Sequence, residues 1–193
     1  MRQYILEEVS KTLATLELMA ADESITAEVE QVAKACCAAL RAGNKILLAG
    51  NGGSAADAQH LAGELVSRLN FDRPGLAAFA LTTDSSVLTA IGNDYGYDLV
   101  FARQVNAVGA PGDVFIGIST SGRSPNITRA LVEARRKGLV TVGLTGQIGG
   151  DMPPLCDYCI RVPSSATPKI QEGHIVLGHI ICGLIECEIF RGD

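Results

Sequence analysis

Two pairs of side chains in this sequence could bind a metal ion or transfer protons. His60 and Glu64 are four residues apart, so in a helix they share one face. Gln171 and His179 are eight residues apart, and at about 3.6 residues per turn they fall roughly on one side of a helix. Histidine and glutamate in such positions suit a metal site or an acid–base pair. The alternatives are an exposed polar pair for His60 and Glu64, and a helix cap for Gln171.

A third histidine, His174, falls on the opposite side of the same predicted helix from His179. Only one of the two can therefore face a common site. We interpret His174 as a structural or interface residue.

The segment 119–126 (STSGRSPN) is rich in hydroxyl groups and lies between an apolar run and a predicted helix. A helix N-terminus has unpaired N–H groups and a partial positive charge, which suit a phosphate. Gly122 allows close approach of the backbone, and Pro125 fits a first helical turn. An ordinary capping loop is the alternative, with Arg123 either assisting or solvated. The segment matches neither a P-loop nor a dinucleotide fingerprint. Four hydroxyls exceed what a cap needs, so we predict a phosphate site at Ser119, Thr120, Ser121 and Ser124.

Short apolar runs alternate with helical segments after residue 44, which predicts an α/β fold with a five-stranded parallel sheet flanked by helices. Ligands bind such sheets at the carboxyl ends of the strands. The glycine-rich segment 50–54 follows the first run and permits close approach of a ligand. The predicted strands are 45–49, 77–81, 113–118, 139–144 and 158–162, and the predicted helices include 55–69, 127–137 and 169–190.

Two helices are predicted before the first strand, with a break at residues 21–24 and an end near Ala42. They either cover one face of the sheet or form an oligomer contact. With no linker or repeat in the sequence, we predict a single domain over residues 1–193, with the helices of residues 1–43 in the oligomer interface. The apolar side chains that share one face of the first helix are Ile5, Val9, Leu13, Leu16 and Met19.

Composition narrows the functional class. The chain has 193 residues, 47% of them hydrophobic, and a net charge of −5. An acidic chain lacks the charge pattern of a nucleic-acid binder. The sequence contains no run of about 18 apolar residues that would predict a membrane span. It also shows no recognisable targeting segment, so we expect a cytoplasmic protein. The six cysteines are expected to be free buried thiols. Cys156 and Cys159 form a C-x-x-C without a second pair, which disfavours zinc or redox chemistry there.

Four motifs in order along the chain resemble the phosphoheptose isomerases, a family of SIS-domain (sugar isomerase) enzymes. They are GNGGSAADAQHLAGELVSR (50–68), LTTDSSVLTAIGNDYGY (81–97), GISTSGRSPN (117–126) and PKIQEGHIVLGHI (168–180). The resemblance implies a three-layer SIS fold with extra N-terminal helices and a homotetramer. It also implies conversion of sedoheptulose 7-phosphate to D-glycero-D-manno-heptose 7-phosphate for bacterial lipopolysaccharide, capsule or glycoprotein.

The resemblance also implies site residues. It implies one zinc ion per subunit, with His60, Glu64, Gln171 and His179 as ligands. The implied substrate contacts are Asn51, Gly52, Gly53, Glu64, Asn93, Asp94, Ser119, Thr120, Ser121, Ser124 and Gln171. We assign Glu64 as the base and His179 as the acid of a cis-enediol path. A metal-bound histidine nitrogen has no proton to give, so zinc is either partly structural or replaces His179 as the electrophile.

Other functions share this fold. A non-catalytic SIS regulatory protein, of the type that associates with the bacterial replication initiator, would need no catalytic pair, and the presence of Glu64 with His179 argues against it. Other SIS enzymes, such as etherases and aminosugar isomerases, are expected to be longer. A SIS module that only binds a sugar phosphate is the remaining alternative.

Overall fold

The computed structural model describes residues 1–191 and contains seven α-helices, two 3-10 helices and five strands within them. The strands are β1 (Ile46–Gly50), β2 (Ala78–Ala80), β3 (Val114–Ile118), β4 (Val140–Gly146) and β5 (Tyr158–Val162). The α-helices are α1 (Arg2–Ala21), α2 (Glu23–Arg41), α3 (Gly53–Val66), α4 (Ser85–Tyr95), α5 (Val100–Val108), α6 (Pro125–Arg136) and α7 (Thr167–Phe190). The 3-10 helices are η1 (Tyr97–Leu99) and η2 (Pro153–Leu155).

All five strands form one parallel sheet in the order β2-β1-β3-β4-β5, as the alternation of strands and helices predicts. Each strand begins and ends within two residues of its predicted bounds. The chain moves outward from β1 to β2 and then returns to the other side of β1. The direction of winding therefore reverses between β1 and β3, which is where doubly wound sheets bind ligands.

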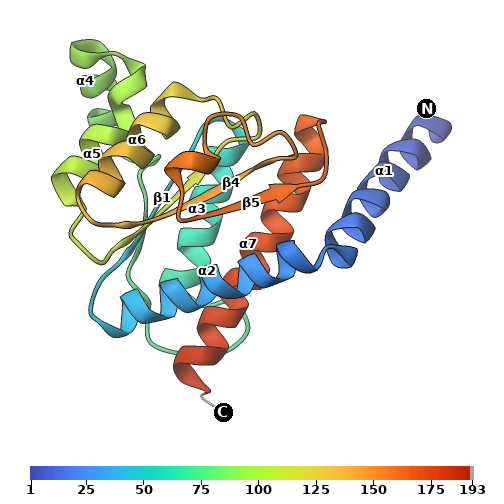
Figure 1. Cartoon of the computed structure of the whole chain (residues 1–193), viewed down its shortest axis with the longest axis horizontal. Coiled ribbons are helices and arrows are strands. Elements are labelled where there is room, and N and C mark those ends of the chain that lie inside the picture. Colours follow the sequence, from blue (N-terminus) through green and yellow to red (C-terminus); the bar gives the residue numbers. More distant parts are fainter. Residues whose placement is uncertain (192–193) are drawn as a thin grey trace.

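Helices cover both faces of the sheet because its strands are apolar on both sides (Figure 1). In β1, Ile46 and Leu48 belong to one core cluster, which also takes side chains from α2, α3 and α7. Leu47 and Ala49 belong to a second cluster with α5 and α6. Successive side chains of a strand point to opposite faces, so this division gives the three-layer architecture predicted from the sequence.

The two N-terminal helices have different surroundings. Helix α2 packs against α7 and β5, and its side chains Val32 and Cys36 are fully buried. Helix α1 contacts α7 and α2 and projects away from the rest of the molecule (Figure 1). On its apolar face only Met19 is buried, whereas Ile5, Val9 and Leu13 are exposed. Of the two N-terminal helices, therefore, only α2 covers the sheet within this chain.

Helix α7 is long and apolar enough, by length and composition alone, to cross a membrane. It packs against α2, α3, β4 and β5, and it buries the charged side chain of Glu186. These contacts are those of a core helix in a globular fold. It begins at Thr167, two residues before the predicted start.

Two features differ from the sequence interpretation. Helices α4 and α5 were not predicted, and α4 has no buried residue. Its N-cap Asp84, which accepts a hydrogen bond from the backbone N–H of Val87, was the available signal. The cysteines are all free, but the expectation that all are buried is wrong: Cys187 is exposed, and Cys156 and Cys159 are half-buried.

Candidate active site

Helices α3 and α7 lie side by side and bring three potential metal ligands together (Figure 1). The Nε2 atoms of His60 and His179 are 2.8 Å apart, and Nε2 of His60 is 3.2 Å from Oε1 of Glu64. One ligand atom from each of the three residues lies within 4.8 Å of the other two. The arrangement excludes the interpretation of His60 and Glu64 as an isolated surface pair.

Close packing of the two helices depends on Gly178. A Cβ atom at this position would lie 2.6 Å from both terminal methyl carbons of Leu61 on α3. With a side chain here, Leu61 would have to shift, so the glycine lets α7 approach α3. Gly178 and Leu61 are the sequence neighbours of His179 and His60, and their contact therefore brings the two histidines together.

Gln171 lies farther along the same interface. Its amide nitrogen is 2.6 Å from the position that a Cβ atom on Gly53 would take, so Gln171 rests against the first turn of α3. Gly53 is seven residues before His60, about two helical turns. The alternative of a helix cap is wrong, because Gln171 is the fifth residue of α7 and the N-cap is Ala166. Gln171 therefore lies against the glycine-rich segment 50–54, here called the glycine loop. Its role as a metal ligand remains a prediction.

The donor atoms of the cluster suit a divalent transition metal. Two imidazole nitrogens and a carboxylate oxygen are ligand types that zinc accepts, and three protein ligands leave a position for a substrate oxygen. His60 is about half exposed and Glu64 is less so, so the cluster is open to a ligand. The residues present therefore fit a metal site.

The loops after β1 and β3 start side by side, because Gly50 and Ile118 are paired in the sheet register. The carboxamides of Asn51 and Asn126 form two reciprocal hydrogen bonds of 2.9 and 2.8 Å across this point. The hydroxyl of Tyr97 donates a further hydrogen bond of 3.2 Å to Oδ1 of Asn51. These contacts join the glycine loop to the start of α6 at the switch point of the sheet. The sequence interpretation named Asn51 alone, because a side-chain amide pair leaves no periodic signal.

The hydroxyl-rich segment Ser119–Ser124, here called the hydroxyl loop, connects β3 to α6 as predicted. Pro125 lies in the first turn of the helix. The Oγ atoms of Ser119 and Ser124 are 2.8 Å apart, and Ser121 Oγ accepts a hydrogen bond from the backbone N–H of Arg123. Ser124 is the N-cap but makes no side-chain capping bond. The first turn of α6 therefore lacks the capping bond that the alternative interpretation requires.

A small cavity of about 180 Å³ adjoins this loop. Thr120, Ser121 and Arg123 line one side of it, and Ser164 and Ser165 line another. The backbone of Gly149 packs directly against this loop: a Cβ atom on Gly122 would lie 1.9 Å from the carbonyl oxygen of Gly149. With φ of +65° at Gly122, only glycine fits here.

The remaining predicted contacts are on α4. Asn93 donates a hydrogen bond of 2.7 Å to its neighbour Asp94, and both side chains are exposed. The structure does not bring either residue to the His60 cluster through any hydrogen bond among residues 1–191. Asp57, one turn before His60 on α3, was not predicted: its Oδ2 is buried without a partner among the described residues, and burial raises the pKa of this carboxyl.

His174 is buried, as its predicted structural role requires. Its Nε2 lies 3.1 Å from the carbonyl oxygen of Thr145. Because a carbonyl can only accept, this nitrogen carries the proton, and Nδ1 has no partner among the described residues. Burial lowers the pKa of His174 to about 4, so the ring is neutral at pH 7.

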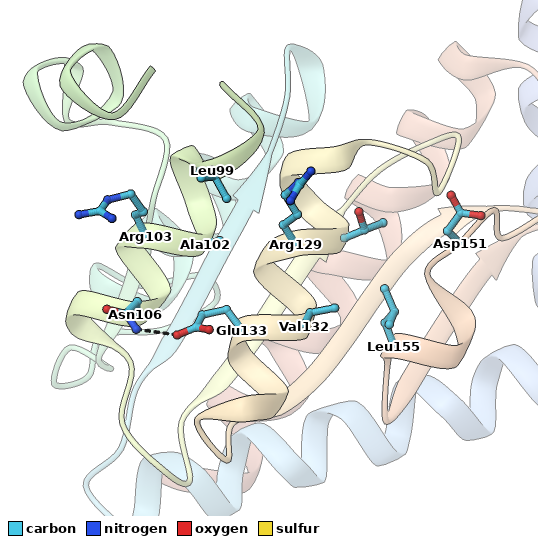
Figure 2. Close-up of a pocket in the computed structure, with 10 residues that line it drawn as sticks. Leu99, Ala102, Arg103, Asn106, Arg129, Val132, Glu133, Asp151 and Leu155 are labelled. Atoms are coloured by element: carbon cyan, nitrogen blue, oxygen red, sulfur yellow. Dashed lines mark hydrogen bonds between the residues drawn. The ribbon is translucent and has the colours of Figure 1, made fainter. Parts of the chain in front are cut away.

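A larger cavity, of about 840 Å³, lies elsewhere, between α5 and α6 (Figure 2). Arg103 and Arg129 are on its rim, and a hydrogen bond from Asn106 to Glu133 crosses one end (Figure 2). None of the predicted site residues lines this cavity. Size alone is therefore a poor guide to the site in this fold.

Comparison with known proteins gives consistent results. The sequence profile of the SIS domain matches residues 10–146. A phosphoheptose isomerase of Burkholderia pseudomallei (strain 1710b) is 61% identical over 97% of this chain and 95% of its own length. The phosphoheptose isomerase of Aneurinibacillus thermoaerophilus is 60% identical over 99% of this chain and 96% of its own. The solved structure of phosphoheptose isomerase from Neisseria gonorrhoeae superimposes with a TM-score of 0.90 at 40% identity, covering 96% of this chain and 98% of that one.

Proposed function

The chain belongs to the phosphoheptose isomerases, a family of SIS-domain enzymes, and we propose that it converts sedoheptulose 7-phosphate to D-glycero-D-manno-heptose 7-phosphate. It is an isomerase, and we propose that it interconverts a ketose and an aldose. The observation that carries the proposed mechanism is the convergence of Glu64 and His179 from two helices, within 4.8 Å of each other and of His60.

We propose that the hydroxyl loop and the N-terminus of α6 hold the phosphate. The partial positive charge at the N-terminus of α6 and the hydroxyls before it suit a dianion. The sugar would then extend along the carboxyl edge of the sheet toward α3 and α7. We propose Ser119, Thr120, Ser121 and Ser124 as phosphate contacts, and Asn51, Gly52, Gly53, Asn93, Asp94 and Gln171 as sugar contacts.

The reaction moves one proton between C1 and C2 and another between the oxygens on these carbons. We assign Glu64 as the base that takes the carbon-bound proton and returns it to the neighbouring carbon through a cis-enediol. His179 is assigned to the oxygens, where an imidazole can give and take a proton near neutral pH. Two groups on separate helices can thus act on adjacent atoms of the substrate.

We propose that the cluster binds one zinc ion through His60, Glu64 and His179, with Gln171 as a fourth ligand if its side chain turns along α7. Zinc, when bound, would polarise the substrate carbonyl as a Lewis acid. Nε2 of His179 cannot hold a metal and a proton at the same time. The acid role of His179 and its ligand role are therefore alternatives at any one moment, and a zinc ion that is only structural would leave proton transfer to other groups.

We further propose a homotetramer of single SIS domains (residues 1–193), located in the cytoplasm. The exposed apolar face of α1 supports self-association through the N-terminal helices, residues 1–43. Six free thiols support a reducing compartment. The product is proposed to supply heptose for lipopolysaccharide or capsule. Neither nucleic acid nor membrane is a proposed partner, given the net charge of −5 and the packing of α7.

The test is turnover of sedoheptulose 7-phosphate in deuterated water. We expect product that carries solvent deuterium at C2, because Glu64 exchanges its proton with solvent during an enediol step. Product formed with strict retention of the substrate hydrogen would argue against a solvent-exchangeable enediol and favour an internal hydride shift. Absence of turnover would contradict the isomerase and support the SIS regulatory or binding proteins instead.

A further inference from the structure

Arg73, in the segment that follows α3, is buried and holds the C-terminal end of that helix. Only 2% of its side chain is exposed. The last four carbonyl groups of an α-helix lack partners within the helix, and the guanidinium is the donor to two of them here and to the carbonyl of the C-cap Ser67. It donates hydrogen bonds to the carbonyl oxygens of Glu64 (2.8 Å), Leu65 (2.7 Å) and Ser67 (3.1 Å).

The same guanidinium pairs with Glu186 on α7. Nε of Arg73 is 3.1 Å from Oε1 of Glu186, whose side chain is fully buried. That carboxylate also accepts hydrogen bonds from the backbone N–H groups of Leu69 (3.0 Å) and Asn70 (2.8 Å). Burial by itself raises the pKa of Glu186, but these hydrogen bonds and Arg73 outweigh it and leave the pKa below its usual value. The pair is therefore charged and fully hydrogen-bonded at neutral pH.

Each partner of this ion pair is connected to a proposed active-site residue. Arg73 holds the backbone carbonyl of Glu64 itself. Glu186 is seven residues after His179, about two turns along α7. We infer that Arg73 and Glu186 are positioning residues, which set the register of α3 against α7 and so keep Glu64 within reach of His179. The inference rests on the proposed roles of Glu64 and His179.

A second ion pair, in which the carboxylate is fully buried, offers a matched control. Asp113 is also fully buried and pairs with Lys45 at 2.6 Å. Like Glu186, it accepts hydrogen bonds from two backbone N–H groups, those of Lys45 and Ala110. It lies just before β3, at the opposite edge of the sheet from the loops that follow β1 and β3. Loss of either pair is expected to cost stability, since each carboxylate is fully buried and is the acceptor for a cation and for two backbone N–H groups.

The experiment compares Glu186→Gln and Arg73→Lys with Asp113→Asn. Thermal unfolding, kcat, KM for sedoheptulose 7-phosphate and zinc affinity are measured on the folded fraction of each. We expect all three to lower Tm. Glu186→Gln and Arg73→Lys alone are expected to lower kcat tenfold to a hundredfold, because small misplacements of reacting groups have effects of that order. Both are also expected to weaken zinc binding at least tenfold, with KM little changed.

Unchanged kcat and zinc affinity in Glu186→Gln and Arg73→Lys would overturn the inference, as would equal losses in Asp113→Asn. Arg73→Lys keeps the charge, so it serves if Glu186→Gln fails to fold. Should wild-type protein show no turnover, the proposed function fails, and the zinc titration still decides the positioning role because it needs no catalysis.

Discussion

His60 and His179 face each other across the α3–α7 interface, with Nε2 atoms 2.8 Å apart and ring planes tilted by 59°. Which of the two nitrogens donates in this contact depends on the tautomers of the two rings. Glu64 lies 3.2 Å from the same nitrogen of His60. The cluster therefore joins acid–base groups and metal ligands in one place, and the first predictions concern its members.

Replacing Glu64 or His179 by glutamine is expected to lower kcat by about 10²–10⁴-fold, the usual contribution of general acid–base catalysis. KM is expected to change little, because the hydroxyl loop still holds the substrate. Steady-state kinetics on folded protein checks this. The control is Glu188→Gln, which changes an exposed glutamate of α7, the helix that carries His179. Full activity in Glu64→Gln would show that this residue is only a solvated part of the helix.

The double replacement of Ser121 and Ser124 by alanine is expected to raise KM strongly. Each hydrogen bond to a charged phosphate contributes about 1.5–3 kcal/mol, which corresponds to roughly tenfold or more per bond. Thr128→Ala, which removes a hydroxyl bonded within α6, controls for changes in the helix. An unchanged KM in the double variant would remove the phosphate from this loop.

Prolonged chelation is expected to abolish most of the activity, and added zinc is expected to restore it. The N/O donor set of His60, Glu64 and His179 suits zinc, and loss of one ligand, as in His60→Gln, is expected to weaken its binding. Residual metal is measured by elemental analysis alongside turnover. Full activity in protein verified as metal-free would refute a catalytic zinc.

Stability is expected to decrease as the pH falls from about 6.5 to about 4, in part through His174. Its pKa is about 4 in the folded protein against 6.5 in the unfolded reference. Between these values the unfolded chain binds more protons, so lowering the pH favours unfolding, by at most about 3 kcal/mol. Urea unfolding of wild type and His174→Gln at several pH values measures it. The variant is expected to be less stable at pH 7 but less sensitive to pH; equal sensitivity would contradict the buried neutral ring.

Charged residues on the exposed apolar face of α1 are expected to dissociate the oligomer. Ile5 and Val9 are both more than half exposed in the single chain, and an aspartate at either position could not be buried without cost. Light scattering at low micromolar concentration is expected to give a tetramer for wild type and for the control Ser10→Asp, and smaller species for Ile5→Asp with Val9→Asp. A wild-type monomer with full activity would exclude this role for α1.

Local patterns predicted the elements of this fold well. The strands are short apolar runs because both faces of the sheet are covered, and each was located within two residues. Pro125 correctly marked the start of α6, since its fixed backbone angle suits the first helical turn. Helix α4 was not predicted, and none of its side chains is fully buried within the chain.

Pairing between distant segments was decided only by the tertiary structure. The sequence by itself indicated His60, Glu64, Gln171 and His179 as candidates through their chemistry and helical spacing, and the resemblance to a family implied their roles. It did not determine that Gly178 would let α7 pack on α3 closely enough to join them, that Asn126 would pair with Asn51, or that Arg73 would reach Glu186. Periodicity reports that a face is buried but not which surface covers it, because packing partners far apart in the chain are chosen by the shape of the whole fold.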